Sequence, residues 1–164
     1  MIDPEESSAT TLCKACGLCC TGHLFIWAKL RSSELDGAES LGLVVHREPH
    51  QRGFNQPCPL WDEVCTIYDN PQYPRFCRTY KCKLLKQLLD ENTTLPAALT
   101  VVQQTISMIH EIEPLLPAST TPNFRERLTA KMKLQDAESD FRSRAEALVV
   151  VIEKQFGVKN FLDE

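Results

Sequence analysis

The stretch Cys13-Lys14-Ala15-Cys16-Gly17-Leu18-Cys19-Cys20 decides how the first half of this 164-residue chain is organised. Two residues separate Cys13 from Cys16, and two separate Cys16 from Cys19. Cysteines so spaced can turn their sulfurs toward one metal ion, because the backbone between them curls and points its amides at the thiolates. Gly17 eases this turn, since glycine tolerates a positive φ. The stretch therefore predicts a metal-binding turn.

Four further cysteines follow, and all eight lie within 70 residues, with none in the second half of the chain. At this density cysteine itself is expected to organise the structure. We expect metal ligation by Cys13, Cys16, Cys19, Cys20, Cys58, Cys65, Cys77 and Cys82.

Direction and spacing predict how the eight thiols divide. Adjacent residues project their side chains in different directions, so Cys19 and Cys20 are not expected to ligate the same ion. Cys13, Cys16 and Cys19, with the remote Cys58-Pro59, resemble the ligand run of bacterial ferredoxins. Cys20, Cys65, Cys77 and Cys82 are left for a second site, or in part as spare thiols. Cys20 and Cys65 are the first candidates for inert core thiols.

The donor chemistry restricts the metal. Thiolates select zinc, iron or an iron–sulfur cluster over magnesium and calcium, which prefer oxygen. Zinc would take four thiolates as a structural staple, whereas a cubane cluster takes four cysteines and carries electrons. The ferredoxin-like spacing favours iron–sulfur at one site and leaves zinc open at the other. The histidines are expected to be surface or core residues, since Pro49 separates His46 from His50 and argues against one helical face.

The ends and the charge of the chain indicate its surroundings. The acidic start, residues 1–6, lacks the basic and apolar regions of a secretory signal. The longest apolar run, Ala147–Ile152, has six residues, whereas a membrane span needs about 20. We therefore expect a cytoplasmic protein, in which disulfides are disfavoured. Its 18 basic and 22 acidic residues are spread evenly, so neither a nucleic acid nor a membrane is an expected partner.

The composition, 43% hydrophobic and 24% charged, is that of one compact globular domain. We predict a small, irregular α+β fold. Residues 1–12 are expected to be a flexible N-terminus, and residues 13–92 a loop-rich, metal-stapled cysteine module with short strands and a hairpin. Residues 93–164 are expected to be a mainly helical extension packed on that module, with helices that can also dock a protein partner.

Short elements are expected inside the module, because glycines and prolines interrupt it frequently. Residues 23–27 and 43–45 are expected to be strands, and residues 60–61 and 66–68 the arms of a hairpin. A short helix is expected to follow Ser32 or Ser33 and to end near Leu41.

Helices are expected after Tyr80. Leucines at helical spacing occupy residues 84–89, and Pro96 stands in a first turn behind the candidate caps Thr93 and Thr94. Pro114 and Pro117 are expected to end that helix. A last helix is expected to open at Pro122 behind Thr121, to stop at Gly157, and to bury one face made of Phe124, Leu128, Phe141, Ala145, Leu148 and Ile152.

The cysteine contexts carry a family resemblance. They are Cys13-x2-Cys16-Gly17-x-Cys19-Cys20, Cys58-Pro59-Leu60, Cys65-Thr66-Ile67-Tyr68, Pro74, Cys77-Arg78 and Cys82. This order resembles the CxxCxxCC cysteine-cluster family, the YkgJ-type zinc- or iron-chelating domain, from about Cys13 to Leu85. The chain departs from it in one place, since an Arg-Pro common in that family is replaced by Asn70-Pro71 and Tyr73-Pro74-Arg75. The resemblance implies a metal or iron–sulfur site built from the eight cysteines. Flagellin lysine N-methylases are similar in this region and are associated with an iron–sulfur cluster.

Two classes of function follow from these patterns. The first is a metal-binding protein that chelates zinc, an iron–sulfur cluster or both through its cysteines. The second is an iron–sulfur redox or group-transfer enzyme, or an accessory to one such as a protein lysine methylation system. The sequence shows no phosphate-cradling glycine loop, nucleophile elbow or paired carboxylates. We therefore predict no catalytic residues, and the first class is favoured.

Overall fold

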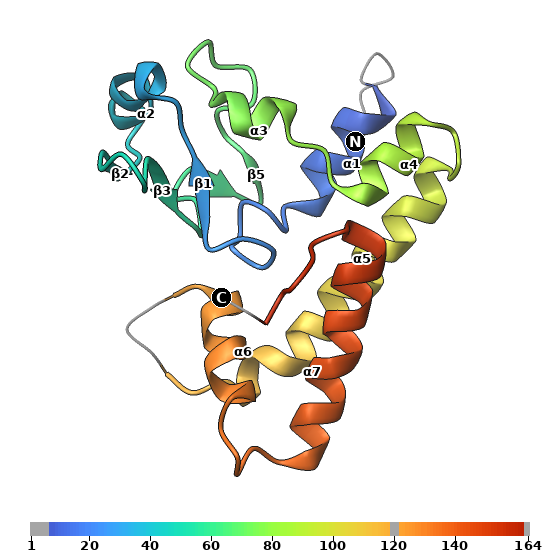
Figure 1. The fold of residues 1–164 in the computed structure, drawn as a ribbon. Coiled ribbons are helices and arrows are strands. Elements are labelled where there is room, and N and C mark those ends of the chain that lie inside the picture. The colour runs from blue at the N-terminus through green and yellow to red at the C-terminus, as the bar shows by residue number, and fades with distance from the viewer. Residues whose placement is uncertain (1–6, 119–121, 163–164) are drawn as a thin grey trace. The chain divides into compact units, whose positions relative to one another are not determined.

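The structure, a computed structural model, describes residues 7–118 and 122–162. It divides into two compact units, which are described separately: the sheet unit, residues 17–80, and the helical unit, the described part of residues 1–16 and 81–164. The described residues contain seven α-helices and five short strands (Figure 1). The chain therefore has the small, irregular α+β fold that the sequence predicts.

A three-stranded antiparallel sheet organises the sheet unit. Its order is β1-β3-β2, formed by Trp27–Lys29, Gly53–Asn55 and Val45–His46. Phe54 of the central strand pairs with Ala28 on one side and with Val45 on the other. The strands expected at residues 23–27 and 43–45 begin four and two residues later than predicted. The sequence does not predict β3, because its three residues show no apolar alternation.

A short helical segment covers the sheet. The helix expected after Ser32 or Ser33 is a 3-10 turn, η1, at Ser32–Glu34, followed by α2 at Leu35–Ser40. Its first turn is closed by Glu34, whose carboxylate accepts the backbone N–H of Arg31 at 2.7 Å, and not by a serine hydroxyl. The buried core of this unit contains Ala28, Leu30, Leu35, Ala38, Leu43 and Phe54.

The hairpin is tighter than predicted. Its strands are β4 at Trp61–Asp62 and β5 at Val64–Cys65, joined through Glu63. Glu63 has a φ of 59°, a left-handed conformation that lets the chain reverse over a single residue. A five-residue helix, α3, follows at Arg75–Thr79.

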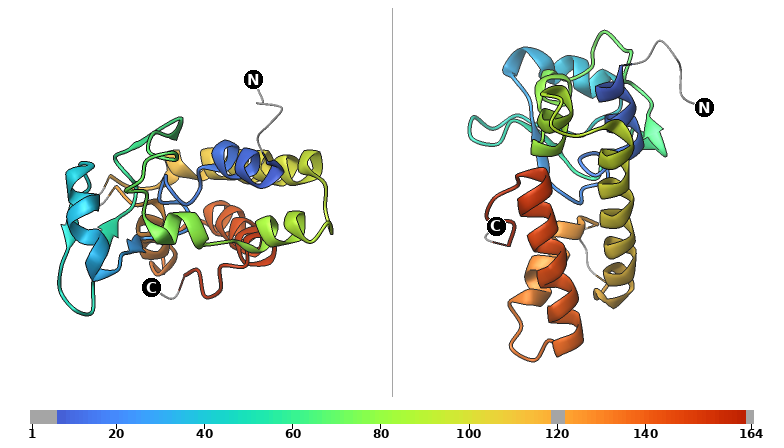
Figure 2. Two further views of the ribbon diagram at one scale, coloured as in Figure 1. Left: turned by 90° about the horizontal axis from the view of Figure 1, so that it is seen from above. Right: turned by 90° about the vertical axis from the view of Figure 1, so that its right-hand side faces the viewer.

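The helical unit is built around one long helix, α5, at Leu95–Ile112. It packs against α1 at Ser8–Cys16, against α4 at Lys83–Leu89 and against α7 at Ser139–Val151. Figure 2 shows α5 and α7 running alongside each other. After α5 comes a 3-10 turn, η2, at Glu113–Leu115, and α7 continues as a π-helical turn, η3, at Ile152–Phe156.

Two predicted helix ends are confirmed. Thr94 caps α5, since its hydroxyl accepts the N–H of Ala97 at 3.3 Å, and Pro96 lies in the first turn. Gly157 terminates the last helical turn with a left-handed φ of 74°. Local sequence predicts these ends because each depends on a few adjacent residues.

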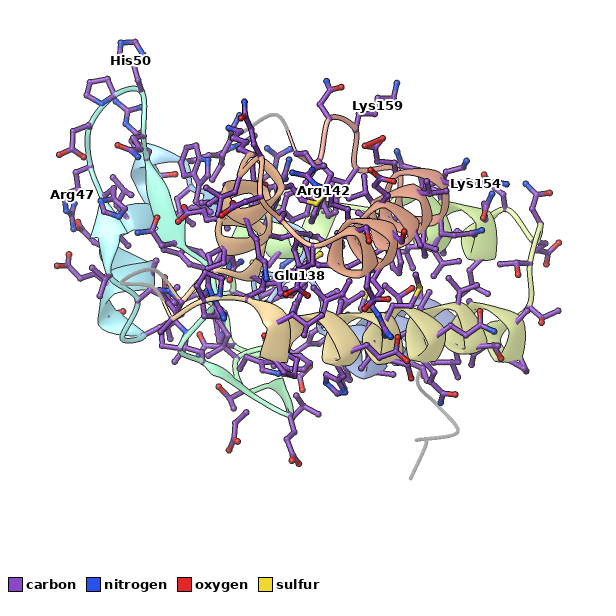
Figure 3. The ribbon with its side chains drawn as sticks, turned by 90° about the horizontal axis from the view of Figure 1, so that it is seen from below. Arg47, His50, Glu138, Arg142, Lys154 and Lys159 are labelled. Carbon is purple, nitrogen blue, oxygen red and sulfur yellow. The ribbon has the colours of Figure 1, made fainter. Side chains whose placement is uncertain are left out.

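The prediction of a single helix from Pro122 to Gly157 is wrong. Two helices occupy this region, α6 at Phe124–Met132 and α7. The α6 helix is capped by Asn123, whose side-chain oxygen accepts the N–H of Glu126 at 3.0 Å, and the candidate cap Thr121 lies outside the described residues. Arg142 closes the loop between the helices by donating to the carbonyl of Met132 at 3.1 Å (Figure 3). The six apolar residues of the predicted face are nevertheless all buried.

The first helix, α1, is also not predicted from the sequence. Residues 8–12, expected to belong to a flexible end, form the first half of α1, and Leu12 is buried. Residues 1–6 of that expected segment lie outside the described residues. Among the described helices, none is both long and apolar enough to span a membrane.

Candidate metal centre

Three cysteines of the sheet unit lie on three neighbouring segments of the chain. The Cys58 N–H donates to the carbonyl of Cys20 at 2.7 Å, which joins the cysteine-rich turn to the Cys58-Pro59 segment. The Cys58 carbonyl accepts the N–H of Trp61 at 3.2 Å, and Trp61 pairs with Cys65 across the hairpin. The backbone therefore links Cys20, Cys58 and Cys65 directly.

Cys77, on α3, shares an electrostatic environment with this group. Burial, together with the charges of Cys58 and Cys65, raises the pKa of the Cys77 thiol to about 12. Burial also raises the pKa of Cys58, with a smaller contribution from Cys65. These thiols are close enough that ionising one disfavours ionising the next.

Tyr73 lies among the same thiols. Its pKa is raised first by burial and then by the charges of Cys77, Cys65 and Cys20. Its hydroxyl donates to the carbonyl of Cys77 at 3.2 Å. We call Cys20, Cys58, Cys65 and Cys77 the sheet-unit thiols. Sequence patterns do not indicate Tyr73, because its position beside the sulfurs depends on the path of the chain between the hairpin and α3.

Backbone amides point at cysteine sulfurs in both units. In the sheet unit, the N–H groups of Leu60 and Trp61 lower the pKa of Cys58 and so oppose its burial. In the helical unit, the N–H of Leu85 donates to the Cys82 sulfur at 3.4 Å. Amides aimed at a sulfur stabilise its thiolate form, which is the form that binds metal.

Three further cysteines form the helical-unit thiols. Cys13 and Cys16 are three residues apart on α1 and so share one helical face. Cys82 caps α4, against which α1 packs. The Cys13 residue is exposed overall, yet atoms around its sulfur desolvate it, and burial followed by the charge of Cys82 raises its pKa to about 11.

This arrangement differs from the predicted division. Sequence spacing joined Cys58 to Cys13, Cys16 and Cys19, whereas within the sheet unit the thiols that couple to Cys58 are Cys65 and Cys77. It also grouped Cys82 with Cys20, Cys65 and Cys77, whereas within the helical unit Cys82 couples to Cys13. Cys19 lies in the turn that ends at Gly22, whose N–H donates to the Cys19 carbonyl at 3.3 Å.

The donor set fits zinc or iron. It consists of sulfur, the soft ligand that both metals accept, and seven of the eight cysteines are half-buried. All eight lie in the described part of the chain and none forms a disulfide there. Across residues 7–118 and 122–162, no group of three or more His, Cys, Asp or Glu side chains is already arranged to hold a metal ion.

All four histidines lie at exposed or half-buried positions. His50 projects from an exposed loop of the sheet unit (Figure 3), and His110 is exposed on α5. His23 is half-buried, and its Nδ1 lies 2.5 Å from the hydroxyl of Thr21. These positions are those of surface and core histidines.

The fold and the clustered thiols define a small cysteine-cluster protein. The chain belongs to the CxxCxxCC family, whose model, described as "Putative zinc- or iron-chelating domain", matches residues 12–98. This confirms the family that the cysteine contexts indicate. No curated protein and no solved structure matches the chain.

Proposed function

We propose that this protein binds zinc or iron through its cysteines and that the sheet-unit thiols form one complete ligand set. The observation that carries the proposal is the electrostatic coupling of Cys58, Cys65 and Cys77. Cys20 joins this group because its charge, like those of Cys65 and Cys77, raises the pKa of Tyr73. Four thiolates are the number that a structural zinc ion or a cubane cluster requires.

Buried thiols whose thiolate forms repel one another are suited to binding a metal cation. A divalent cation removes that repulsion, and the amides aimed at Cys58 offset part of the cost of burying charge. Bound zinc would crosslink the segments that carry the ligands, whereas an iron–sulfur cluster would add one-electron chemistry.

The helical-unit thiols, Cys13, Cys16 and Cys82, are proposed to bind metal separately from the sheet-unit thiols. They supply three sulfurs, one fewer than a closed tetrahedral site contains. The expectation that all eight cysteines are ligands thus remains part of the proposal, with Cys19 as the one whose set is unassigned.

Metal analysis of serine variants tests the proposal. The protein is purified anaerobically, its zinc and iron are quantified, and its absorption is recorded, since iron thiolates absorb near ~400 nm and zinc does not. Cys58→Ser, Cys65→Ser and Cys77→Ser should each remove the same share of the metal. Cys13→Ser is the matched control from the other set and should leave that share bound. Purified protein without stoichiometric zinc or iron would refute metal binding, and loss of all metal from every variant would refute two separate sets.

A further inference from the structure

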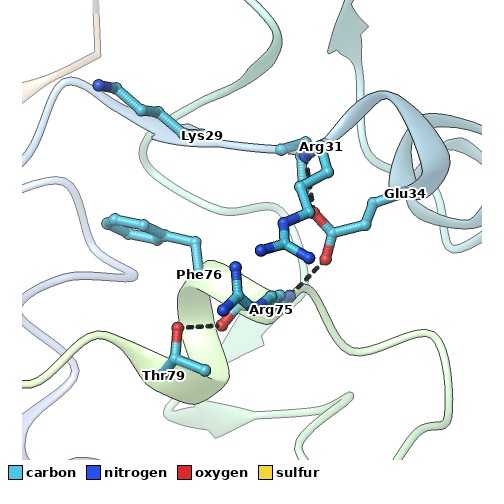
Figure 4. A pocket seen from close by; sticks show the side chains of 7 residues that line it. Lys29, Arg31, Glu34, Arg75, Phe76 and Thr79 are labelled. Atoms are coloured by element: carbon cyan, nitrogen blue, oxygen red, sulfur yellow. Dashed lines mark hydrogen bonds between the residues drawn. The ribbon is translucent and has the colours of Figure 1, made fainter.

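A pocket of about 210 Å³ lies in the sheet unit, where the chain leaving β1 faces α3. Its lining includes Lys29, Arg31, Glu34, Arg75, Phe76 and Thr79 (Figure 4). None of these residues is among the eight cysteines. The metal proposal therefore does not account for the pocket.

The pocket lining contains one carboxylate, Glu34, and both of its oxygens accept hydrogen bonds from backbone N–H groups. One oxygen of Glu34, Oε2, accepts the N–H of Arg31 at 2.7 Å, and the other, Oε1, accepts the N–H of Arg75 at 2.6 Å. Glu34 thereby ties α3 to the segment after β1, and it positions the two arginines on the same pocket. The hydroxyl of Thr79 also has a backbone partner, since it donates to the carbonyl of Arg75 at 2.8 Å.

The cationic side chains, in contrast, have no acidic partner. Among the described residues, no ion pair involves Lys29, Arg31 or Arg75. Arg47 of the same unit shows the alternative, because it pairs with both Asp36 and Glu39. Three cations and one carboxylate give the pocket a formal excess of two positive charges. Figure 4 shows the guanidinium groups of Arg31 and Arg75 on the same side of Glu34.

Phe76 adds a rigid apolar wall. Its ring stacks on Tyr80 with centroids 5.3 Å apart and meets Phe25 edge-on at 6.1 Å. A ring held from two sides offers a fixed surface to the non-polar part of a ligand.

We propose that this pocket binds a small organic oxyanion, a phosphate ester or a carboxylate. Guanidinium groups bind such oxygens with paired, charge-assisted hydrogen bonds, and two of them without acidic partners border the same cavity. Phe76 contacts the organic part of the ligand. The site is distinct from the thiols, although α3 carries both Arg75 and Cys77.

Calorimetric titration of the full chain, as purified with its metal, tests this site. The probes are phenyl phosphate, benzoate and inorganic phosphate at constant ionic strength. We expect saturable one-site binding of phenyl phosphate or benzoate, tighter than that of inorganic phosphate, and the tighter of the two identifies the ligand chemistry. Arg31→Gln and Arg75→Gln should each weaken binding by about tenfold or more, and Arg75→Lys, which keeps the charge, should weaken it less.

Arg47→Gln is the matched control, because it removes an arginine of the same unit whose charge is already neutralised. It should bind the probes like the parent protein. Absence of saturable binding by all three probes would overturn the proposal, and so would equal binding by the Arg31→Gln, Arg75→Gln and parent proteins. Zinc and iron content, measured on each variant, separates this result from the metal proposal, since lost anion binding at full metal content concerns the pocket alone.

Discussion

At the scale of single residues, the proposed metal binding depends on the pKa of each cysteine thiol, because the thiolate is the form that binds metal. Burial raises the pKa of Cys77 to about 12 and that of Cys13 to about 11, well above the ordinary thiol value of 9.0. Both thiols are therefore protonated at neutral pH in the metal-free protein. Metal binding must displace these protons.

Metal affinity should consequently rise with pH. Each thiolate that binds releases one proton, so the apparent affinity for zinc should increase by about tenfold or more per unit between pH 6 and pH 8. Competition with a chelator of known affinity measures this dependence. The stability of the metal-free fold depends on pH in the opposite direction. A thiol pKa that is higher in the folded state than in the unfolded state contributes stability that is lost as the pH rises through the folded-state pKa. A zinc affinity independent of pH would contradict thiolate ligation.

Gly17 is a residue at which a single added methyl group should be costly. Its φ is +65°, and an added Cβ would lie 2.2 Å from the Trp61 ring. Gly17→Ala should lower the free energy of unfolding by about 2 kcal/mol more than Gly42→Ala. Gly42 is a matched control, because it also has a positive φ, +100°, but no atom within 4 Å of the added Cβ. Urea unfolding followed by tryptophan fluorescence measures both variants, and equal losses would show that Trp61 moves aside at no cost.

At the scale of elements, short strands and turns carry the ligands of the sheet unit, whereas regular helices build the helical unit. The hairpin that bears Cys65 has two residues in each strand, and α3, which bears Cys77, has five residues in all. Elements of this length are not stable alone. They depend on the core and, in our proposal, on metal.

The long helix α5 depends more on its own sequence. Because the hydroxyl of Thr94 accepts the N–H of Ala97, Thr94→Ala should lower the free energy of unfolding by about 1 kcal/mol. Thr93→Ala is the control, as the neighbouring threonine does not cap the helix. Urea unfolding followed by far-ultraviolet circular dichroism gives the comparison, and equal effects of the two variants would contradict the cap.

At the scale of the whole molecule, the two units differ in what stabilises them. The sheet unit has a small buried cluster of six apolar residues. The helical unit buries four phenylalanines, Phe124, Phe141, Phe156 and Phe161. Metal ligation should thus contribute a larger share of stability to the sheet unit.

Metal removal should separate the two units spectroscopically. Both tryptophans of the chain, Trp27 and Trp61, belong to the sheet unit, whereas the long helices belong to the helical unit. Chelation under reducing conditions should therefore change the tryptophan fluorescence and the near-ultraviolet dichroism while most of the helical signal remains. Zinc or iron added back should restore the original spectra. Unchanged tryptophan signals in protein shown to be metal-free would contradict a metal-dependent sheet unit.

Features that depend on neighbouring residues could be predicted from the sequence alone. The cysteine contexts identified the family, and Thr94 and Gly157 marked helix ends, because a cap is made by residues within one turn. The apolar face from Phe124 to Ile152 was also correct as a set of buried residues.

The way in which distant segments meet could not be predicted from the sequence and is seen in the folded chain. Spacing could not show that Cys58 couples to Cys65 and Cys77, because that coupling depends on the hairpin turning at Glu63 and on where α3 lies. Nor could it show that Glu34 joins the backbones of Arg31 and Arg75 and so lines one pocket with both arginines. The physical reason is that such contacts require a chain already folded by its core, and no local pattern records them.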